Sequence, residues 1–232
     1  MSNGQPKFSL NDLAGNPHDF PTDKASLICF VKEDCETCNT AAPVLEALHK
    51  TYGSKVNVLL ISQSGDANNA FAQRHHLSMP VLDDQSCKTA FEWGIESVPS
   101  VFWSDEKGVI TSQFEGFIRV DWDTLAADMK TQTALPLAQI DWASLPKWRP
   151  GCGSKHLDPE VYDKLRAEAD GSPIRARRID IASSDDVMEL MFDQGFSDGL
   201  PLVPPTPERV MRMLGGTHRD PQDVVATVPP NM

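Results

Sequence analysis

Residues 26–45 decide the fold of this chain, and they read SLICFVKEDCETCNTAAPVL. The run Leu27–Val31 is apolar and strand-sized, which predicts a buried strand. Cys35 and Cys38 follow at once, and apolar residues then recur at helical spacing until Gly53 ends the pattern. The stretch therefore predicts a strand, a Cys-x-x-Cys turn and a helix in direct succession.

The same alternation of strands and helices continues to residue 134. Residues 8–20 are expected to form an irregular lead-in, with turn residues in its middle. Further strands are expected at 56–61, 79–82, 98–103 and 109–114, and further helices at 66–77, 86–93 and 121–133. Helices between strands predict a parallel sheet with both faces covered, and a hairpin at residues 105–108 adds an antiparallel edge. The fold class is therefore α/β.

The position of the two cysteines favours redox chemistry. The attacking species is a thiolate, and the free N–H groups and partial positive charge of a helix N-terminus stabilise an anion. Two residues of helix between the cysteines bring the second sulfur close enough to resolve a mixed disulfide. The first cysteine is expected to be exposed at the turn, so Cys35 is the candidate nucleophile and Cys38 the resolving thiol.

A strand, Cys-x-x-Cys and helix in this order resembles the thioredoxin superfamily. Pro43 lies eight positions after Cys35 and matches the proline that kinks the first helix in that family. Residues 94–100 read GIESVPS and match the family segment that ends in a cis-proline before a strand. The resemblance covers roughly residues 8–134, with room for an extra element as in TlpA-like and other redoxin-type members. It implies a thioredoxin fold, in which helices flank a central mixed sheet.

The resemblance also implies the arrangement of the site. Pro99 would lie against the Cys35 sulfur, and the backbone of Val98 would pair with an extended substrate segment. The predicted function is thiol–disulfide exchange. The candidate catalytic residues are Cys35, Cys38, Pro99 and Glu36, and the candidate substrate-binding residues are Val98 and Thr37. No cofactor and no metal site is expected.

Two departures from the family pattern bear on the chemistry. Glu36 and Thr37 replace the usual Gly-Pro pair, and Cys29 stands where thioredoxin has a buried acid. The proton acceptor would then be Glu36, Glu33 or water. Glu33, Asp34 and Glu36 lie beside the thiol and are expected to disfavour its thiolate, which would make the couple a stronger reductant. The sequence therefore predicts a reductase-leaning oxidoreductase.

The chain changes character after residue 134. Residues 135–175 are rich in proline and glycine and indicate a structured linker, with one short helix near its end. Cys152 lies in a loop of this linker with cationic neighbours, and two interpretations are open: a secondary redox thiol, or an incidental exposed cysteine. Residues 176–232 predict a small, mostly helical C-terminal unit. Its few apolar residues and its Pro-Pro end suggest that it packs on the first domain or is incomplete.

Composition excludes several other classes of function. The net charge of −12 argues against a nucleic-acid binder and against docking on an anionic membrane. No apolar run is long enough for membrane insertion, and residues 1–7 lack the features of a signal peptide. Five cysteines with only one close pair do not form a secreted disulfide framework. The predicted location is therefore cytoplasmic.

Two alternative functions remain open beside the leading one. A peroxiredoxin-like thiol peroxidase would use the same first cysteine, although the Pro-x-x-x-Thr pattern of those enzymes is absent before Cys35. A non-enzymatic carrier of Cu(I) or Hg(II) would use both thiolates. For the leading function the expected partners are a protein or small-molecule disulfide and an electron-donating reductase or thiol.

Overall fold

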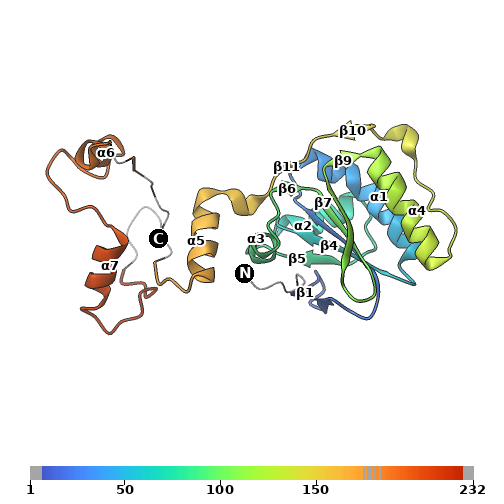
Figure 1. The fold of residues 1–232 in the computed structure, drawn as a ribbon, viewed down its shortest axis with the longest axis horizontal. Helices are drawn as coiled ribbons and strands as arrows, with labels where there is room; N and C mark the ends of the chain where they lie inside the picture. The colour runs from blue at the N-terminus through green and yellow to red at the C-terminus, as the bar shows by residue number, and fades with distance from the viewer. Residues whose placement is uncertain (1–6, 175, 177–178, 180, 183, 227–232) are drawn as a thin grey trace. The chain divides into compact units, whose positions relative to one another are not determined.

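The computed structural model describes residues 7–226 except 175, 177, 178, 180 and 183 (Figure 1). It divides into two compact units, Met1–Val161 and Tyr162–Met232. The boundary lies inside the predicted linker, so residues 135–161 belong to the first unit. Residues 1–6, which were expected to lack a signal peptide, and the Pro-Pro end of the chain lie outside the described residues.

A five-stranded mixed sheet forms the centre of the first unit. Its order is β5-β4-β3-β7-β8. The strands are β3 (Ser26–Val31), β4 (Asn57–Ser62), β5 (Val81–Asp83), β7 (Ser100–Ser104) and β8 (Ile110–Glu115). β3, β4 and β5 pair in parallel, whereas β7 pairs antiparallel with both β3 and β8. The predicted mixed sheet with an antiparallel edge is confirmed.

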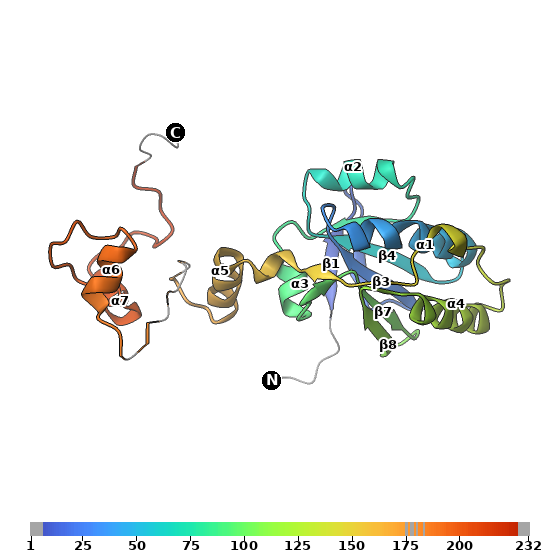
Figure 2. The same cartoon turned by 90° about the horizontal axis from the view of Figure 1, so that it is seen from above.

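Four helices accompany this sheet (Figure 2). They are α1 (Glu36–Tyr52), α2 (Ala67–Arg74), α3 (Lys88–Glu92) and α4 (Arg119–Thr133). α1 and α4 contact each other. α4 begins two residues before the predicted cap at Asp121, and the backbone N–H of Arg119 donates to the carbonyl of Lys147 at 3.0 Å. A remote segment thus satisfies a donor that a capping side chain would otherwise serve.

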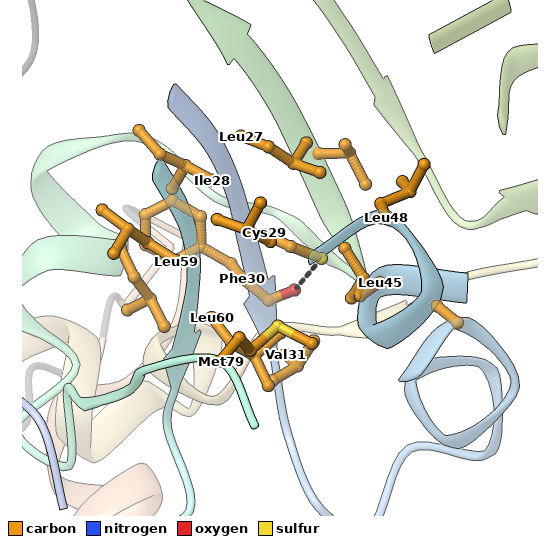
Figure 3. Packing of buried hydrophobic residues seen from close by; sticks show 14 of the residues in the cluster. Leu27, Ile28, Cys29, Phe30, Val31, Leu45, Leu48, Leu59, Leu60 and Met79 are labelled. Carbon is orange, nitrogen blue, oxygen red and sulfur yellow. Dashed lines mark hydrogen bonds between the residues drawn. The ribbon is translucent and has the colours of Figure 1, made fainter. Parts of the chain in front are cut away.

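The central strand β3 is buried along its whole length, and its side chains alternate between the two faces of the sheet. Figure 3 shows Cys29 directed toward Leu45 and Leu48 of α1, with Phe30 directed to the other side. The Cys29 thiol donates to the carbonyl of Phe30 at 3.9 Å. Burial raises the pKa of Cys29, so this residue packs as a small apolar side chain.

The lead-in is a hairpin, so the expectation of an irregular segment is wrong. β1 (Phe8–Asn11) pairs antiparallel with β2 (Pro17–Phe20). The rings of Phe8 and Phe20 stack at 5.6 Å, and both pack against Trp93, which also contacts Phe30 of the central strand. This aromatic packing across distant parts of the chain holds two strands of only four residues each.

The segment after α4 contains short elements that sequence patterns do not reveal. Two 3₁₀ turns, η1 (Trp142–Ser144) and η2 (Lys155–Leu157), flank the two-residue strands β10 (Trp148–Arg149) and β11 (Cys152–Gly153). β10 pairs antiparallel with β9 (Phe117–Ile118), and β11 pairs antiparallel with β6 (Ser97–Val98). Residues 147–155, called the strap from here on, therefore lie along the edge that carries Val98.

The predicted helices of the C-terminal region are present. They are α5 (Pro159–Ala169), α6 (Val187–Asp193) and α7 (Pro207–Leu214). The Asp186 carboxylate caps α6 by accepting from two backbone N–H groups, and Thr206 precedes α7 with proline at its first position, as the sequence predicts. Within the described residues, no helix combines the length and apolarity needed to cross a membrane.

Candidate active site

The first cysteine occupies the N-cap of α1. Cys35 has an extended backbone, and its sulfur accepts a hydrogen bond from the backbone N–H of Cys38 at 3.4 Å. Polar side chains do the same at other helix starts, where they satisfy a free N–H group. The local sequence thus places the Cys35 sulfur where a helix N-terminus stabilises negative charge.

The segment before β7 closes over this sulfur. The Val98–Pro99 peptide bond is cis, as the resemblance implied. The Cys35 sulfur lies 3.5 Å from the carbonyl oxygen of Val98. The structure therefore brings together four of the residues singled out in the sequence: Cys35, Cys38, Val98 and Pro99.

A third cysteine reaches the same place from the strap. The sulfurs of Cys35 and Cys152 lie 2.7 Å apart, and Cys152 pairs with Val98 in the β11–β6 ladder. Cys35 and Cys38 are both fully buried, whereas Cys152 is partly exposed. The expectation that Cys35 is the exposed thiol is therefore wrong, because the strap covers it.

Residues on both sides of Cys152 fix the strap. The hydroxyl of Thr37 donates to the carbonyl of Pro150 at 2.6 Å. The backbone N–H of Ser154 donates to the carbonyl of Glu96 at 3.0 Å, and the Gln63 amide donates to the Ser154 hydroxyl at 2.8 Å. Val98 and Thr37, the predicted substrate-binding residues, thus both hold a segment of the chain itself. Gln63 and Glu96 carry no sequence signal that would have marked them.

The acidic residues near the thiol are each paired with a base. Glu33 lies 2.5 Å from Arg74, Glu36 lies 2.6 Å from Arg149, and Asp34 lies 3.7 Å from Lys32. Each acid that was expected to disfavour the thiolate thus has a basic side chain beside it. Arg74 and Arg149 come from segments distant in sequence, and the reductase-leaning balance of the couple stays a prediction.

Hydrogen bonds and burial together set the pKa values of the three sulfurs. A hydrogen bond from the Cys38 side chain, supported by one from Cys152 and by backbone N–H groups, lowers the pKa of Cys35 to about 5, although burial opposes this shift. Burial, followed by the hydrogen bond to Cys35, raises the pKa of Cys38 and also that of Cys152. At neutral pH the site therefore holds one thiolate, on Cys35, and two neutral thiols.

The remaining candidates lie further from the sulfurs. The side chain of Glu36 is 83% exposed and is directed to Arg149, so a role as proton acceptor requires this ion pair to open. That role stays a prediction. Cys87 is buried at the start of α3, where burial raises its pKa to about 11, so it holds no thiolate at neutral pH. No cluster of three or more His, Cys, Asp or Glu side chains suited to a metal ion occurs among the described residues.

The N-terminal half of the chain, which carries Cys35, Cys38 and Pro99, is similar to known proteins. Residues 2–113 match the AhpC/TSA family. The chain is 31% identical over 112 residues to the thioredoxin-like protein YneN of Bacillus subtilis, a match that covers 45% of this chain and 65% of that protein. Over this region the chain is similar to redoxin-type members of the thioredoxin superfamily.

Two further proteins similar to this thioredoxin domain are named for thiol–disulfide chemistry. It is 27% identical over 113 residues to the thiol:disulfide interchange protein DsbE of Xylella fastidiosa, a match that covers 47% of this chain and 52% of that protein. It is 26% identical over 117 residues to the thiol-disulfide oxidoreductase ResA of Geobacillus thermodenitrificans, a match that covers 48% of this chain and 67% of that protein. The chain thus spans between about half and two thirds of the length of these relatives.

Solved structures show the same fold. A candidate protein disulfide isomerase from Bacteroides thetaiotaomicron superposes with a TM-score of 0.51 at 15% identity, over 56% of this chain and 87% of that one. A candidate DsbE from Chlorobium tepidum gives a TM-score of 0.50 at 19% identity, over 56% and 94%. At these identities the likeness establishes the thioredoxin fold alone.

The hydrogen bond from Cys38 predicts how Cys35 of the thioredoxin domain titrates. Thiolate absorbance at 240 nm should rise with a midpoint near pH 5. Cys38→Ala removes the largest cause of the lowered pKa and should move the midpoint to higher pH. Cys38→Ser keeps a hydrogen-bond donor and should move it less. A reduced protein that shows no thiolate absorbance below pH 7 would contradict this description of the site.

Proposed function

We propose that the thioredoxin domain catalyses thiol–disulfide exchange through Cys35 and Cys38. The observation that carries the proposal is the Cys35 sulfur at the N-terminus of α1, bonded to the N–H of Cys38 and beside the Val98 carbonyl. A sulfur in this position is a thiolate at neutral pH and has a second thiol within reach. The redox names of the relatives support the same reaction class.

The proposed reaction has two displacement steps. The Cys35 thiolate attacks one sulfur of a substrate disulfide, the substrate S–S bond breaks, and the departing thiolate takes a proton. The Cys38 thiol then loses its proton and attacks the Cys35 sulfur, which releases the second substrate thiol. Two electrons pass from the protein to the substrate, and the protein keeps a Cys35–Cys38 disulfide. The reverse steps need an electron-donating thiol or reductase as partner.

The reducing strength of the Cys35–Cys38 couple is expected to differ from what the acidic residues near Cys35 predict. A Cys35 thiolate that is stabilised at neutral pH stabilises the reduced form, and this makes the couple more oxidising. We infer a couple that is less reducing than the reductase-leaning one expected from Glu33, Asp34 and Glu36. The electron donor and the cytoplasmic location stay predictions.

Exchange with a small disulfide tests the proposal. Reduced protein mixed with glutathione disulfide should release two glutathione molecules for each Cys35–Cys38 disulfide formed, as mass mapping would show. The Cys87→Ser variant serves as a matched control, because Cys87 is a buried cysteine outside the site. Faster reaction with hydrogen peroxide than with the disulfide would favour a peroxidase instead. Tight binding of Cu(I) with no release of glutathione would favour a metal carrier.

A further inference from the structure

The strap meets the active-site edge in the way that an extended peptide substrate would. Cys152 pairs with Val98 and Gly153 pairs with Ser97, both antiparallel, immediately before the cis-proline. Addition of a strand to a free sheet edge is a common mode of peptide recognition, in which main-chain hydrogen bonds hold the backbone. The strap therefore fills the edge at which Val98 was expected to bind substrate.

Contacts before Cys152 fix its approach. β10 pairs with β9, the Arg149 guanidinium bonds the Glu36 carboxylate, and the Thr37 hydroxyl bonds the Pro150 carbonyl. The last two contacts come from the two residues that separate Cys35 from Cys38. The residues inside the Cys-x-x-Cys motif thus recognise the strap directly.

Contacts after Cys152 hold the other side. Ser154 is buried and bonds the carbonyl of Glu96 through its N–H and the amide of Gln63 through its hydroxyl. The backbone N–H of Lys155 donates to the Gln63 side chain at 2.9 Å. The strap is therefore held on both sides of Cys152. A movement of the strap away from Cys35 would break several of these hydrogen bonds.

Glycine makes the close main-chain approach possible. A Cβ atom on Gly151 would lie 2.0 Å from the Ser97 hydroxyl and 3.1 Å from the Val98 carbonyl. Gly116, at a φ of +70°, would place its own Cβ 3.0 Å from the carbonyl of Arg149 and from the N–H nitrogen of Gly151. A larger residue at position 151 would therefore push the strap away from β6.

We propose that the strap is an intramolecular substrate of the domain, in which Cys152 takes the place of a substrate cysteine and forms a disulfide with Cys35. The inference rests on the proposed function, because it uses Cys35 as the nucleophile of an exchange reaction. It assigns Cys152 as the third thiol of the couple and makes the strap a competitor of outside polypeptides for the Val98 edge.

The exchange among the three sulfurs balances without an added oxidant. Starting from the Cys35–Cys38 disulfide, the Cys152 thiol loses its proton and attacks the Cys35 sulfur. The Cys35–Cys152 bond forms, the Cys35–Cys38 bond breaks, and the electron pair goes to Cys38, which takes the proton. The disulfide thus moves from two fully buried residues to a pair that includes the partly exposed Cys152, where an outside thiol can reach it.

A trapping experiment on the full chain tests this assignment. Cys38→Ala leaves Cys35 with Cys152 as its neighbouring thiol, and one equivalent of diamide should convert most of the protein to a monomer with a Cys35–Cys152 disulfide, identified by peptide mapping. Adding Cys152→Ser should abolish this product. Adding Gly151→Val should slow its formation by about tenfold, because the strap is no longer held beside Cys35. Circular dichroism checks that each variant is folded.

The outcomes separate this inference from the function on which it rests. Free Cys35 and Cys152 after oxidation, or disulfides only between molecules, would overturn the assignment of the strap. The Cys152→Ser variant alone should still form a Cys35–Cys38 disulfide with glutathione disulfide. If it does while Cys38→Ala forms no Cys35–Cys152 disulfide, the proposed function stands and the inference falls. If Cys35 and Cys38 never pair in Cys152→Ser, the proposed function itself fails.

Discussion

Replacing Cys35 by serine is expected to abolish disulfide exchange, with a loss on the order of a thousandfold or more, as when other enzymes lose their nucleophile. A serine hydroxyl at the N-cap of α1 preserves the hydrogen bond to the N–H of Cys38, so the fold should be retained. The measurement is the rate of glutathione release from glutathione disulfide, followed alongside circular dichroism.

The controls for this prediction use the other cysteines of the chain. Cys87→Ser should retain the rate of the unmodified protein, because burial raises the pKa of Cys87 to about 11 and it holds no thiolate at neutral pH. Exchange that persists in Cys35→Ser would mean that another thiol attacks the substrate. Cys152, as the partly exposed thiol, would be the first to examine.

Replacing Trp122 by alanine is expected to lower the free energy of unfolding of the first unit by about 3–5 kcal/mol. Trp122 is fully buried on α4, and its ring packs edge-on against Phe114 at 5.2 Å and beside Phe117 at 5.8 Å. The substitution would leave a cavity between α4 and the antiparallel edge of the sheet. Urea unfolding followed by circular dichroism measures the change.

Trp122→Phe is the matched control for this substitution. The indole N–H of Trp122 is buried without a hydrogen-bond partner among the described residues, so its removal sacrifices no hydrogen bond. The phenylalanine ring fills most of the same space, and the expected loss is below about 1.5 kcal/mol. Equal effects of the two substitutions, or a loss below about 1 kcal/mol for alanine, would contradict the packing described for α4.

The sequence was sufficient to predict the sheet and the position of the cysteine pair. The apolar run 27–31 and the helical spacing after Cys38 are local signals of buried strands and helices. The segment 94–100 identified Pro99 through its resemblance to a known family. These features depend on residues close together in the chain, which is why pattern analysis recovers them.

The strap that covers Cys35 could not be predicted from such local patterns. β10 and β11 are two-residue strands, too short for any periodic pattern, and they form only because β9 and β6 offer them an edge. The loop around Cys152 therefore appeared as an exposed part of a linker. Its proximity to Cys35 comes from tertiary contacts across more than a hundred residues.

The charge environment of Cys35 could not be predicted from the sequence for a related reason. Glu33 and Glu36 lie beside Cys35 in sequence, and the sequence alone presents them as free charges. Their partners, Arg74 and Arg149, lie on α2 and on the strap. Charge in a sequence shows how many acids surround a group, and only the fold shows which of them are paired.

The measurement that tests the central claim most directly is a redox titration of the Cys152→Ser variant in glutathione buffers, with acid quenching and mapping of the linked cysteines. Removal of the third thiol isolates the Cys35–Cys38 pair. We predict one reversible two-electron transition in which Cys35 and Cys38 are oxidised together to a disulfide. A Cys38 thiol that stays free while Cys35 accumulates a mixed disulfide with glutathione would contradict exchange through this pair.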